Sequence, residues 1–312
     1  MRGPSPKRIS SLHQKIPAWY RRHRRQFLWR NTHDPYIILV SEIMLQQTQA
    51  QRVNEKLPLF LRRFPSFSAL AKAPKADVIR GWRGMGYNNR AVRLRELAQA
   101  IIGHYRGKLP ADINSLRGLP GIGPYTAHAV ACFALGQIVP VVDVNVERVL
   151  SRLFWPMKCL DERMSKDIIT RMAQRLLPED AYVWNQALME FGALVCTAMK
   201  PSCSHCSIND VCCSRNLELV ATQTARRKAV SRKKLEPMHV GIPQRLWRGK
   251  IVEVLRNVDG EGVSLPKLGK KIKLDFSRSE LQWLNNLIVK LEHDGILVRR
   301  GTGSASRISL PG

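Results

Sequence analysis

Four cysteines close together in the sequence constrain the fold of this chain more than any other feature. Cys196, Cys203, Cys206 and Cys212 lie within seventeen residues, in the pattern Cys-x6-Cys-x2-Cys-x5-Cys. One compact loop with these spacings can wrap a cubane iron–sulfur cluster, whereas structural zinc usually shows two separated Cys-x-x-Cys pairs. The pattern predicts a [4Fe–4S] cluster with these four ligands, and zinc is the alternative. Cys213 is adjacent to the fourth ligand, and we interpret it as a spare.

The cysteine content also indicates a compartment. The chain has seven cysteines, an odd number, and five of them lie between positions 196 and 213. Such crowding is unlike an extracellular disulfide framework and fits metal or cluster ligation in a reducing environment. The sequence shows no run of about 18 uncharged apolar residues and no leader-like apolar start. We therefore expect a soluble intracellular protein, cytoplasmic and nucleoid-associated, without membrane contact.

The charge of the chain points to a polyanionic partner. The sequence contains 51 lysines and arginines against 24 aspartates and glutamates, which gives a formal net charge of +27. An excess this large is far beyond what solubility requires. A nucleic acid is the partner that such a charge favours.

The length of 312 residues favours two or three compact units rather than one. Residues 11–213 read as short amphipathic helices separated by Pro and Gly, for example at 91–105 and 166–177, with almost no alternating strand pattern. We therefore predict an all-α core over residues 11–213, with the cluster loop at 196–212. Residues 214–242 are rich in Arg and Lys and are predicted to form a basic linker or a strap that faces the partner.

The C-terminal residues 243–312 predict a small α+β domain. Amphipathic runs at 244–258 and 265–269 precede a longer helix over 277–293, which a Ser277 and Glu280 capping box would open. Two strand-like runs at 296–300 and 307–310 follow, joined by a Gly/Ser turn. Three helices and a β-hairpin are the outline of a winged helix-turn-helix, although other small α+β domains share it.

A glycine-containing segment lies between two predicted helices in the middle of the core. Gly121 and Gly123 belong to the sequence LPGIGPYTA at 119–127, between a helix that ends near Leu116 and one that begins near Tyr125. Glycines here allow a close helix connection and leave backbone N–H groups at a helix start free to hold a phosphate. We predict that Gly121 and Gly123 contact a nucleic-acid backbone.

Taken together, several segments resemble the helix-hairpin-helix DNA glycosylases, which include endonuclease III and the MutY-type adenine glycosylases. LPGIGPYTA is followed by VVDVNVERV at 141–149, which sets Asp143 before a helix. Matches to the MutY branch are LWR at 28–30, DPY at 34–36, SEIMLQQTQ at 41–49, and GMGY at 84–87 with Arg90 and Ala91. The resemblance covers roughly residues 11–213 and implies a two-lobed, endonuclease III-like fold.

The resemblance implies a DNA glycosylase of base excision repair that acts on double-stranded DNA as a monomer. Breaking an N-glycosidic bond builds positive charge on the sugar and negative charge on the leaving base. Asp143 matches the carboxylate that stabilises the sugar cation and helps to deliver water. Glu42 matches the acid that protonates a purine ring nitrogen, although alone it would pass for a solvated helix residue.

Two further catalytic positions follow from the same resemblance. Tyr125 occupies the place of the Schiff-base lysine in bifunctional endonuclease III-type enzymes, and a phenol cannot form that imine. We therefore expect a monofunctional enzyme without lysine-dependent lyase activity, in which Tyr125 hydrogen-bonds the carboxylates or packs against the flipped base. Asn145 is similar to the asparagine that supports the aspartate, but a plain helix-start asparagine is an alternative.

The resemblance also implies DNA contacts. An enzyme of this kind must extrude its base and fill the gap that the base leaves. Gln46, Gln47 and Tyr87 match the residues that fill this gap or wedge beside the orphan base, and Arg30 is counted with them. The alternative for Tyr87 is a packed aromatic residue.

The chain departs from the MutY pattern in two places. Residues 243–312 do not resemble the C-terminal domain that inspects 8-oxoguanine, and Tyr87-Asn88-Asn89 replaces the usual double tyrosine. Adenine opposite 8-oxoguanine or guanine is the expected substrate. Thymine or uracil opposite guanine, and a deaminated purine such as hypoxanthine, are alternatives. A non-catalytic iron–sulfur regulator that binds DNA through the winged helix is an alternative from another class.

Overall fold

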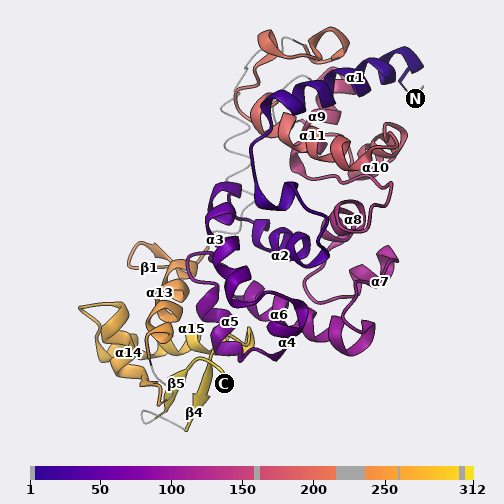
Figure 1. Ribbon diagram of the computed structural model, residues 1–312. Helices are drawn as coiled ribbons and strands as arrows, with labels where there is room; N and C mark the ends of the chain where they lie inside the picture. Colours follow the sequence, from indigo (N-terminus) through magenta and orange to yellow (C-terminus); the bar gives the residue numbers. More distant parts are fainter. Residues whose placement is uncertain (1–3, 158–161, 216–235, 259–260, 302–305) are drawn as a thin grey trace. The chain divides into compact units, whose positions relative to one another are not determined.

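The computed structural model describes residues 4–157, 162–215, 236–258, 261–301 and 306–312. They are mainly helical, as the sequence predicts, and the described strands lie in the C-terminal part (Figure 1). In the described ranges, no helix is long and apolar enough to cross a membrane. Most of the predicted basic linker, at 216–235, and the turn at 302–305 lie outside the described residues.

The chain forms two compact units and passes between them several times. Of the described residues, unit 1 contains 4–38, 111–117 and those from 123 to 215. Unit 2 contains 39–110, 118–122 and those from 236 onwards. Each unit therefore combines segments that are far apart in the sequence. The domain boundaries at 213 and 243 stay predictions.

Unit 1 is built around two helices from opposite ends of its sequence. The first helix packs against the last one, and both bury apolar side chains such as Leu12, Ile16 and Phe191. Its longer helices are α1 (Pro6–His23), α8 (Pro124–Phe133), α9 (Val144–Phe154), α10 (Lys166–Arg175) and α11 (Ala181–Leu194). Its shorter helices are η1 (Leu28–Arg30), α7 (Ile113–Arg117), η2 (Cys203–His205) and η3 (Asn209–Val211).

Unit 2 begins within α2 (Pro35–Leu45), the helix that contains most of the SEIMLQQTQ segment. Its next helices are α3 (Ala50–Arg63), α4 (Phe67–Lys72), α5 (Lys75–Gly81) and α6 (Asn89–Tyr105). Helix α6 packs along α4 and α5. The predicted helix at 91–105 is confirmed, and it begins two residues earlier.

The C-terminal segment, residues 236–312, has the connectivity of a winged helix-turn-helix. Its strands β3, β5 and β4 form one antiparallel sheet in that order. The elements are β1 (Met238–His239), β2 (Ile242–Pro243), α13 (Gln244–Arg256), β3 (Val263–Ser264), α14 (Leu265–Ile272), η4 (Arg278–Glu280), α15 (Leu281–His293), β4 (Val298–Arg300) and β5 (Arg307–Ser309). The capping box of Ser277 and Glu280 is present, although it opens a 3-10 turn that precedes α15.

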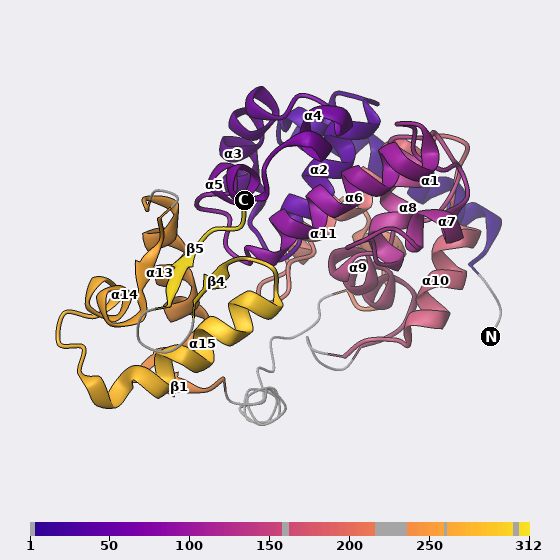
Figure 2. The same ribbon diagram turned by 90° about the horizontal axis from the view of Figure 1, so that it is seen from below.

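The sequence did not predict the hairpin of β1 and β2, which occupies the end of the expected linker. Strands of two residues are too short to show an alternating pattern of apolar and polar side chains. The C-terminal segment also packs on α5 of the same unit, next to α13 (Figure 2).

Candidate active site

Asp143 is the N-cap residue of α9. Its Oδ1 accepts hydrogen bonds from the backbone N–H groups of Asn145, at 2.9 Å, and Val146, at 2.8 Å. Its Oδ2 accepts a hydrogen bond from Nδ2 of Asn145, at 2.6 Å. Burial raises the pKa of Asp143, while these hydrogen bonds and the charge of Arg148 act in the opposite direction. The carboxylate is therefore held in one orientation at the positive end of a helix.

Asn145 connects Asp143 to Arg148 on the next turn of α9. Oδ1 of Asn145 accepts a hydrogen bond from Nη2 of Arg148, at 2.8 Å. The same Nη2 donates to the carbonyl of Gly192, and Nε donates to the carbonyl of Cys196, both at 2.6–2.7 Å. One line of hydrogen bonds thus runs from the aspartate to the first cysteine of the predicted cluster loop.

A glycine allows the two helices at this point to approach closely. A Cβ atom on Gly192 of α11 would lie 2.7 Å from Cβ of Asn145 and 3.0 Å from its carbonyl oxygen. Real Cβ atoms do not come this close to other heavy atoms, so Gly192 is the side-chain-free position against which Asn145 packs.

Tyr125 lies near the start of α8 and is half-buried. Its hydroxyl lies 3.7 Å from the sulfur of Met189, which belongs to α11. This contact places the phenol in unit 1, the unit that also contains Asp143.

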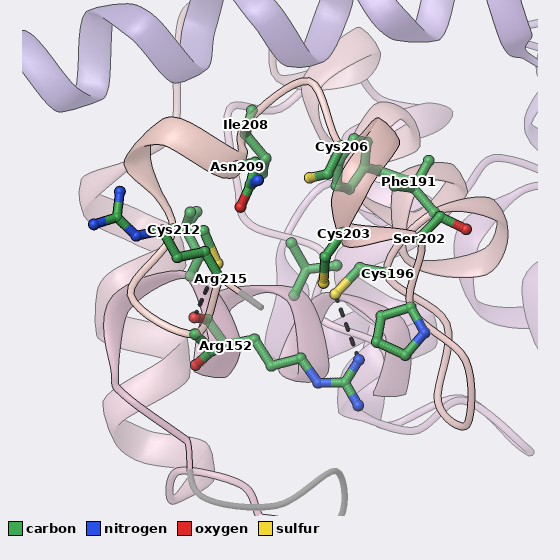
Figure 3. Close-up of a pocket in the computed structure, with 15 residues that line it drawn as sticks. Arg152, Phe191, Cys196, Ser202, Cys203, Cys206, Ile208, Asn209, Cys212 and Arg215 are labelled. Carbon is green, nitrogen blue, oxygen red and sulfur yellow. Dashed lines mark hydrogen bonds between the residues drawn. The ribbon is translucent and has the colours of Figure 1, made fainter. Parts of the chain in front are cut away.

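The four predicted ligands, Cys196, Cys203, Cys206 and Cys212, line one cavity, together with apolar side chains of α9 and α11 (Figure 3). We call residues 196–212 the cysteine loop. In the described part of the chain, no three His, Cys, Asp or Glu side chains form a group that could hold a metal ion. Burial raises the pKa of Cys206 to about 11 and that of Cys212 to about 12. A thiolate at either position therefore needs a neighbouring positive charge or a metal.

Arg152 attaches the cysteine loop to α9. Its guanidinium donates to the carbonyls of Thr197, at 2.7 Å, and Ala198, at 3.1 Å, and Nη1 lies 3.6 Å from the sulfur of Cys196. The thiol of Cys212 donates to the carbonyl of Arg152, at 3.3 Å. Cys213 is exposed, and its sulfur lies 3.5 Å from Nη2 of Arg8.

Glu42 is buried, with 4% of its surface exposed, on the part of α2 that belongs to unit 2. Its neighbours Ile43 and Met44 are also buried. This burial agrees with the enclosed position that the sequence indicates. Glu42 belongs to unit 2 and Asp143 to unit 1.

Arg90 is one of the matches to the MutY branch, but the sequence assigned it no role. It is 6% exposed and donates to the carbonyls of Ile43 and Met44 at the end of α2, at 2.9–3.0 Å, and to that of Gln46. It also donates to the carbonyls of Met85, at 3.0 Å, and Gly86, at 3.2 Å. Burial lowers the pKa of Arg90 to about 10. Its place three residues after Tyr87, the last residue of the GMGY motif, was the available signal.

Two of the predicted DNA contacts have unusual backbone angles. Gln47 has φ +56° and Tyr87 has φ +42°, the left-handed region that non-glycine residues rarely adopt, and both side chains are exposed. Such strain persists where surrounding contacts enforce it, and it is common at functional sites. Arg90 supplies such contacts on both sides. We call residues 84–89 the Tyr87 turn.

The predicted hairpin joins α7 and α8, as expected from its glycines. Gly121 has φ +79°, and Gly123 is the N-cap residue of α8. The side-chain amide of Gln46 lies 3.4 Å from the carbonyl oxygen of Gly121, so these two predicted DNA contacts are neighbours in unit 2.

Arg30, a predicted DNA contact, takes part in a buried ion pair, and its DNA contact stays a prediction. Its side chain is 10% exposed and pairs with Glu190 at 2.7 Å. Arg25 binds the same carboxylate through two nitrogen atoms, each at 2.8 Å. The side chain of Glu190 is fully buried, and the two arginines lower its pKa to about 2. A buried charge needs such partners, which explains why the guanidinium of Arg30 faces inward.

Comparisons with known proteins agree with this architecture. Residues 40–178 match the family model described as HhH-GPD superfamily base excision DNA repair protein. The adenine DNA glycosylase of Mycobacterium tuberculosis (strain ATCC 25618 / H37Rv) is 40% identical over 256 residues, which are 80% of each chain.

Solved structures show the same fold. A thermostable thymine-DNA glycosylase superposes with a TM-score of 0.63 and 32% identity, covering 67% of this chain and 97% of that one. Endonuclease III trapped on DNA superposes with a TM-score of 0.58 and 22% identity, covering 68% of this chain and 97% of that one. The predicted endonuclease III-like fold is thereby confirmed.

Proposed function

This chain belongs to the HhH-GPD superfamily of base excision DNA repair proteins, and we propose that it is a monofunctional DNA glycosylase that removes adenine opposite 8-oxoguanine or guanine. The observation that carries the proposal is the carboxylate of Asp143, held by three hydrogen bonds at the start of α9. The adenine DNA glycosylase that shares 40% identity over 80% of each chain supports the choice of base.

Asp143 would act on the sugar. Three donors and the helix start favour its ionised form, which opposes the cost of burial. A fixed negative charge stabilises the positive charge that develops on the sugar as the base departs, and it needs no reorganisation at that moment. Asn145, itself held by Arg148, keeps the second oxygen in place.

Glu42 would act on the base. A purine leaves more readily when a ring nitrogen is protonated, and a carboxylic acid in an enclosed site can donate that proton. Glu42 is one of the few buried acidic side chains in the described ranges and follows Ser41, which is also buried. Glu42 would then be the acid that protonates the base and Asp143 the carboxylate that stabilises the sugar, the two roles found in other sugar chemistry with two carboxyl groups.

The reaction would end at an abasic site. Tyr125 takes the position at which the lysine nucleophile of bifunctional relatives would be expected, and its phenol cannot form an imine with the sugar. Water is then the nucleophile, and the strand stays intact after base release.

A [4Fe–4S] cluster in the cysteine loop is part of this proposal. The four cysteines line one cavity and are the residue type that ligates such a cluster. In the described ranges their sulfur atoms are not yet gathered into a metal-holding group, so binding of the cluster would draw them together. The guanidinium of Arg152, 3.6 Å from the sulfur of Cys196, would balance the negative charge of the ligands. When bound, the cluster supplies a covalent cross-link of the loop; Arg148 and Arg152 join that loop to α9.

Double-stranded DNA with a mispaired base is the proposed partner, and the monomer is the proposed functional form. Action on the chromosome implies that the protein works inside the cell, where the DNA is. The winged-helix topology of residues 243–312 adds a second segment that could contact the duplex.

Removal of thymine or uracil opposite guanine is the second candidate. The thymine-DNA glycosylase that superposes at 32% identity favours it. A pyrimidine gains less than a purine from a proton on the ring, so Glu42 would matter less for this substrate.

Single-turnover base release from duplexes with A:8-oxoG, A:G, hypoxanthine:T, T:G and U:G separates the candidates. We expect adenine release in the wild type and a loss of at least about 100-fold in Asp143→Asn and Glu42→Gln. Asp167→Asn at the start of α10 and Glu96→Gln on α6 are matched exposed controls. Release of thymine or uracil alone would establish the second candidate. Release of no base from any duplex would favour the DNA-binding regulator.

A further inference from the structure

The C-terminal segment and the Tyr87 turn are parts of one packed structure. Ala76 and Ile79 of α5 and Val92 of α6 share a buried core with residues of the C-terminal segment. Those residues include Trp247, Ile251, Leu255, Leu287, Ile288 and Leu291. Because the core is continuous, the C-terminal segment cannot move away from α5 without exposing apolar surface.

Arg256 of α13 connects the two parts directly. Its side chain is 5% exposed, and it donates to the carbonyl of Ile79, at 3.1 Å, and to Oδ1 of Asn88, at 2.8 Å. Arg83, directly before the turn, donates to Oδ1 of Asn257, at 2.7 Å, and pairs with Glu253, at 3.0 Å. The residue that follows Tyr87 is therefore fixed by a helix of the C-terminal segment.

A cleft of about 330 Å³ lies between the Tyr87 turn and the C-terminal segment. Tyr87, Asn88 and Asn89 line one side, and Arg245 and Arg248 of α13 line the other. The two arginine side chains are 50% and 37% exposed. A strained, exposed aromatic residue thus shares a cleft with two accessible guanidinium groups.

The present partners of these arginines are carboxylates. Glu236 accepts from the backbone N–H of Arg245, at 2.8 Å, and from its guanidinium, at the first turn of α13. Asp294, which also lines the cleft, lies 3.9 Å from Arg248. Donors that converge on a carboxylate at a helix start can also hold a phosphate, and arginine binds both groups in a bidentate manner.

We propose that this cleft binds the phosphate backbone of the DNA strand that Tyr87 contacts, with Arg245 and Arg248 as the phosphate ligands. The inference rests on the proposed function, since it takes Tyr87 to be a DNA contact. The C-terminal segment thereby completes the DNA interface of the Tyr87 turn. Phosphate displaces Glu236 and Asp294, and the two carboxylates weaken binding in proportion to their charge.

The test is equilibrium binding to a duplex with a stable abasic analogue, measured between 50 and 200 mM salt. Each lost phosphate contact lowers the salt slope by about 1, so Arg245→Gln/Arg248→Gln lowers it by about 2. When the salt concentration rises fourfold, the affinity of both proteins falls, and the factor by which it falls is about tenfold smaller for that variant than for the wild type. Glu236→Gln/Asp294→Asn should bind more tightly than the wild type.

Two matched variants control for overall charge. Lys270→Gln/Lys271→Gln removes two exposed positive charges from α14, and Asp275→Asn/Glu261→Gln removes two exposed negative charges. If these controls change the slope and affinity as much as the cleft variants do, the effect is general charge and the proposal is wrong. An unchanged slope in Arg245→Gln/Arg248→Gln also overturns it.

A double-mutant cycle locates the site. Tyr87→Ala and Arg245→Gln/Arg248→Gln should be non-additive in binding, because the groups they remove contact the same strand. Additive effects would contradict a shared strand. Base release is measured separately. If the wild type releases the base and Arg245→Gln/Arg248→Gln leaves the salt slope unchanged, only the proposal for the cleft is wrong. If the wild type releases no base and the variant lowers the slope, the glycosylase proposal is wrong and the phosphate site in the cleft stands.

Discussion

The cysteine loop of unit 1 and the Tyr87 turn of unit 2 are both irregular segments held by buried arginines, but the arginines differ in origin. Arg152 reaches the cysteine loop from 45 residues away on α9, the helix that Asp143 caps. Arg256 reaches Asn88 from 168 residues away, in the C-terminal segment. The first segment is therefore fixed to the helix that Asp143 caps, and the second depends on the C-terminal segment.

The origin of the supporting arginines determines which other residues move when either segment shifts. A shift of the cysteine loop would move Arg148 and with it Asn145, so the loop and the aspartate are constrained together. The Tyr87 turn has local support from Arg90 and remote support from Arg256. Its shape can therefore be altered by changes in the C-terminal segment as well as by changes at Arg90.

Removing Arg90 should have the largest effect on stability. Arg90→Gln would leave the carbonyls of Ile43, Met44 and Met85 without this donor, and we expect a loss of about 4 kcal/mol in the free energy of unfolding. Chemical denaturation followed by circular dichroism measures it. Arg93→Gln, exposed on the same helix, is the control and should change little. Equal losses in both variants would show that Arg90 has no special role.

Acid should weaken unit 1 through Glu190. Its pKa in the folded protein is about 2, below the ordinary 4.5, so its stabilisation is complete above pH 4.5 and disappears as the pH falls towards 2. We expect about 3 kcal/mol to be lost over this window. Denaturation of the wild type and of Glu190→Gln at several pH values measures it, with exposed Glu179→Gln as the control. A variant as acid-sensitive as the wild type contradicts the assignment.

A side chain at Gly192 should destabilise unit 1, whereas a side chain at a comparable glycine of unit 2 should not. Gly192→Ala forces Cβ against Asn145 in unit 1, and we expect a loss of about 2 kcal/mol together with slower base release. Gly103→Ala in α6 of unit 2 is the matched control, since nothing lies within 4 Å of its added Cβ. Alanine there should be neutral or stabilising. Thermal unfolding and single-turnover kinetics measure both, and similar behaviour of the two variants would contradict the tight contact.

Removing Arg256, which holds the Tyr87 turn from the C-terminal segment, should have the smallest effect on stability. Arg256→Gln removes the bonds to Ile79 and Asn88, and we expect a loss of about 1–2 kcal/mol because the apolar core around α13 remains. Limited proteolysis at the Tyr87 turn, compared with exposed Lys267→Gln, shows whether the turn loosens. A turn that is as well protected as in the wild type would mean that Arg90 alone holds it.

The sequence predicted the features that depend on local pattern. Asp143 before an amphipathic run marked the start of α9, and Ser277 with Glu280 marked a capping box. The features that it did not predict depend on contacts between distant residues. Nothing near Arg256 indicates that its partner is Asn88, and the motif around Arg30 did not reveal the buried Glu190.

The sequence also did not predict the strained backbone angles. Positive φ is read from glycines, and Gln47 and Tyr87 are not glycines, so their angles could be known only from the structure. The roles of Asp143, Glu42, Tyr125 and Asn145 stay predictions that the base-release assay tests.

The pairing of α1 with α11 has a consequence for biosynthesis. Helix α1 presents Leu12, Ile16 and Trp19 to α11, which the ribosome makes about 160 residues later. At a synthesis rate of about 5–20 residues per second, the apolar face of α1 stays without α11 for roughly ten to thirty seconds. The nascent chain is therefore expected to engage chaperones during that interval, and slower codons between the two helices should lower the yield of native protein.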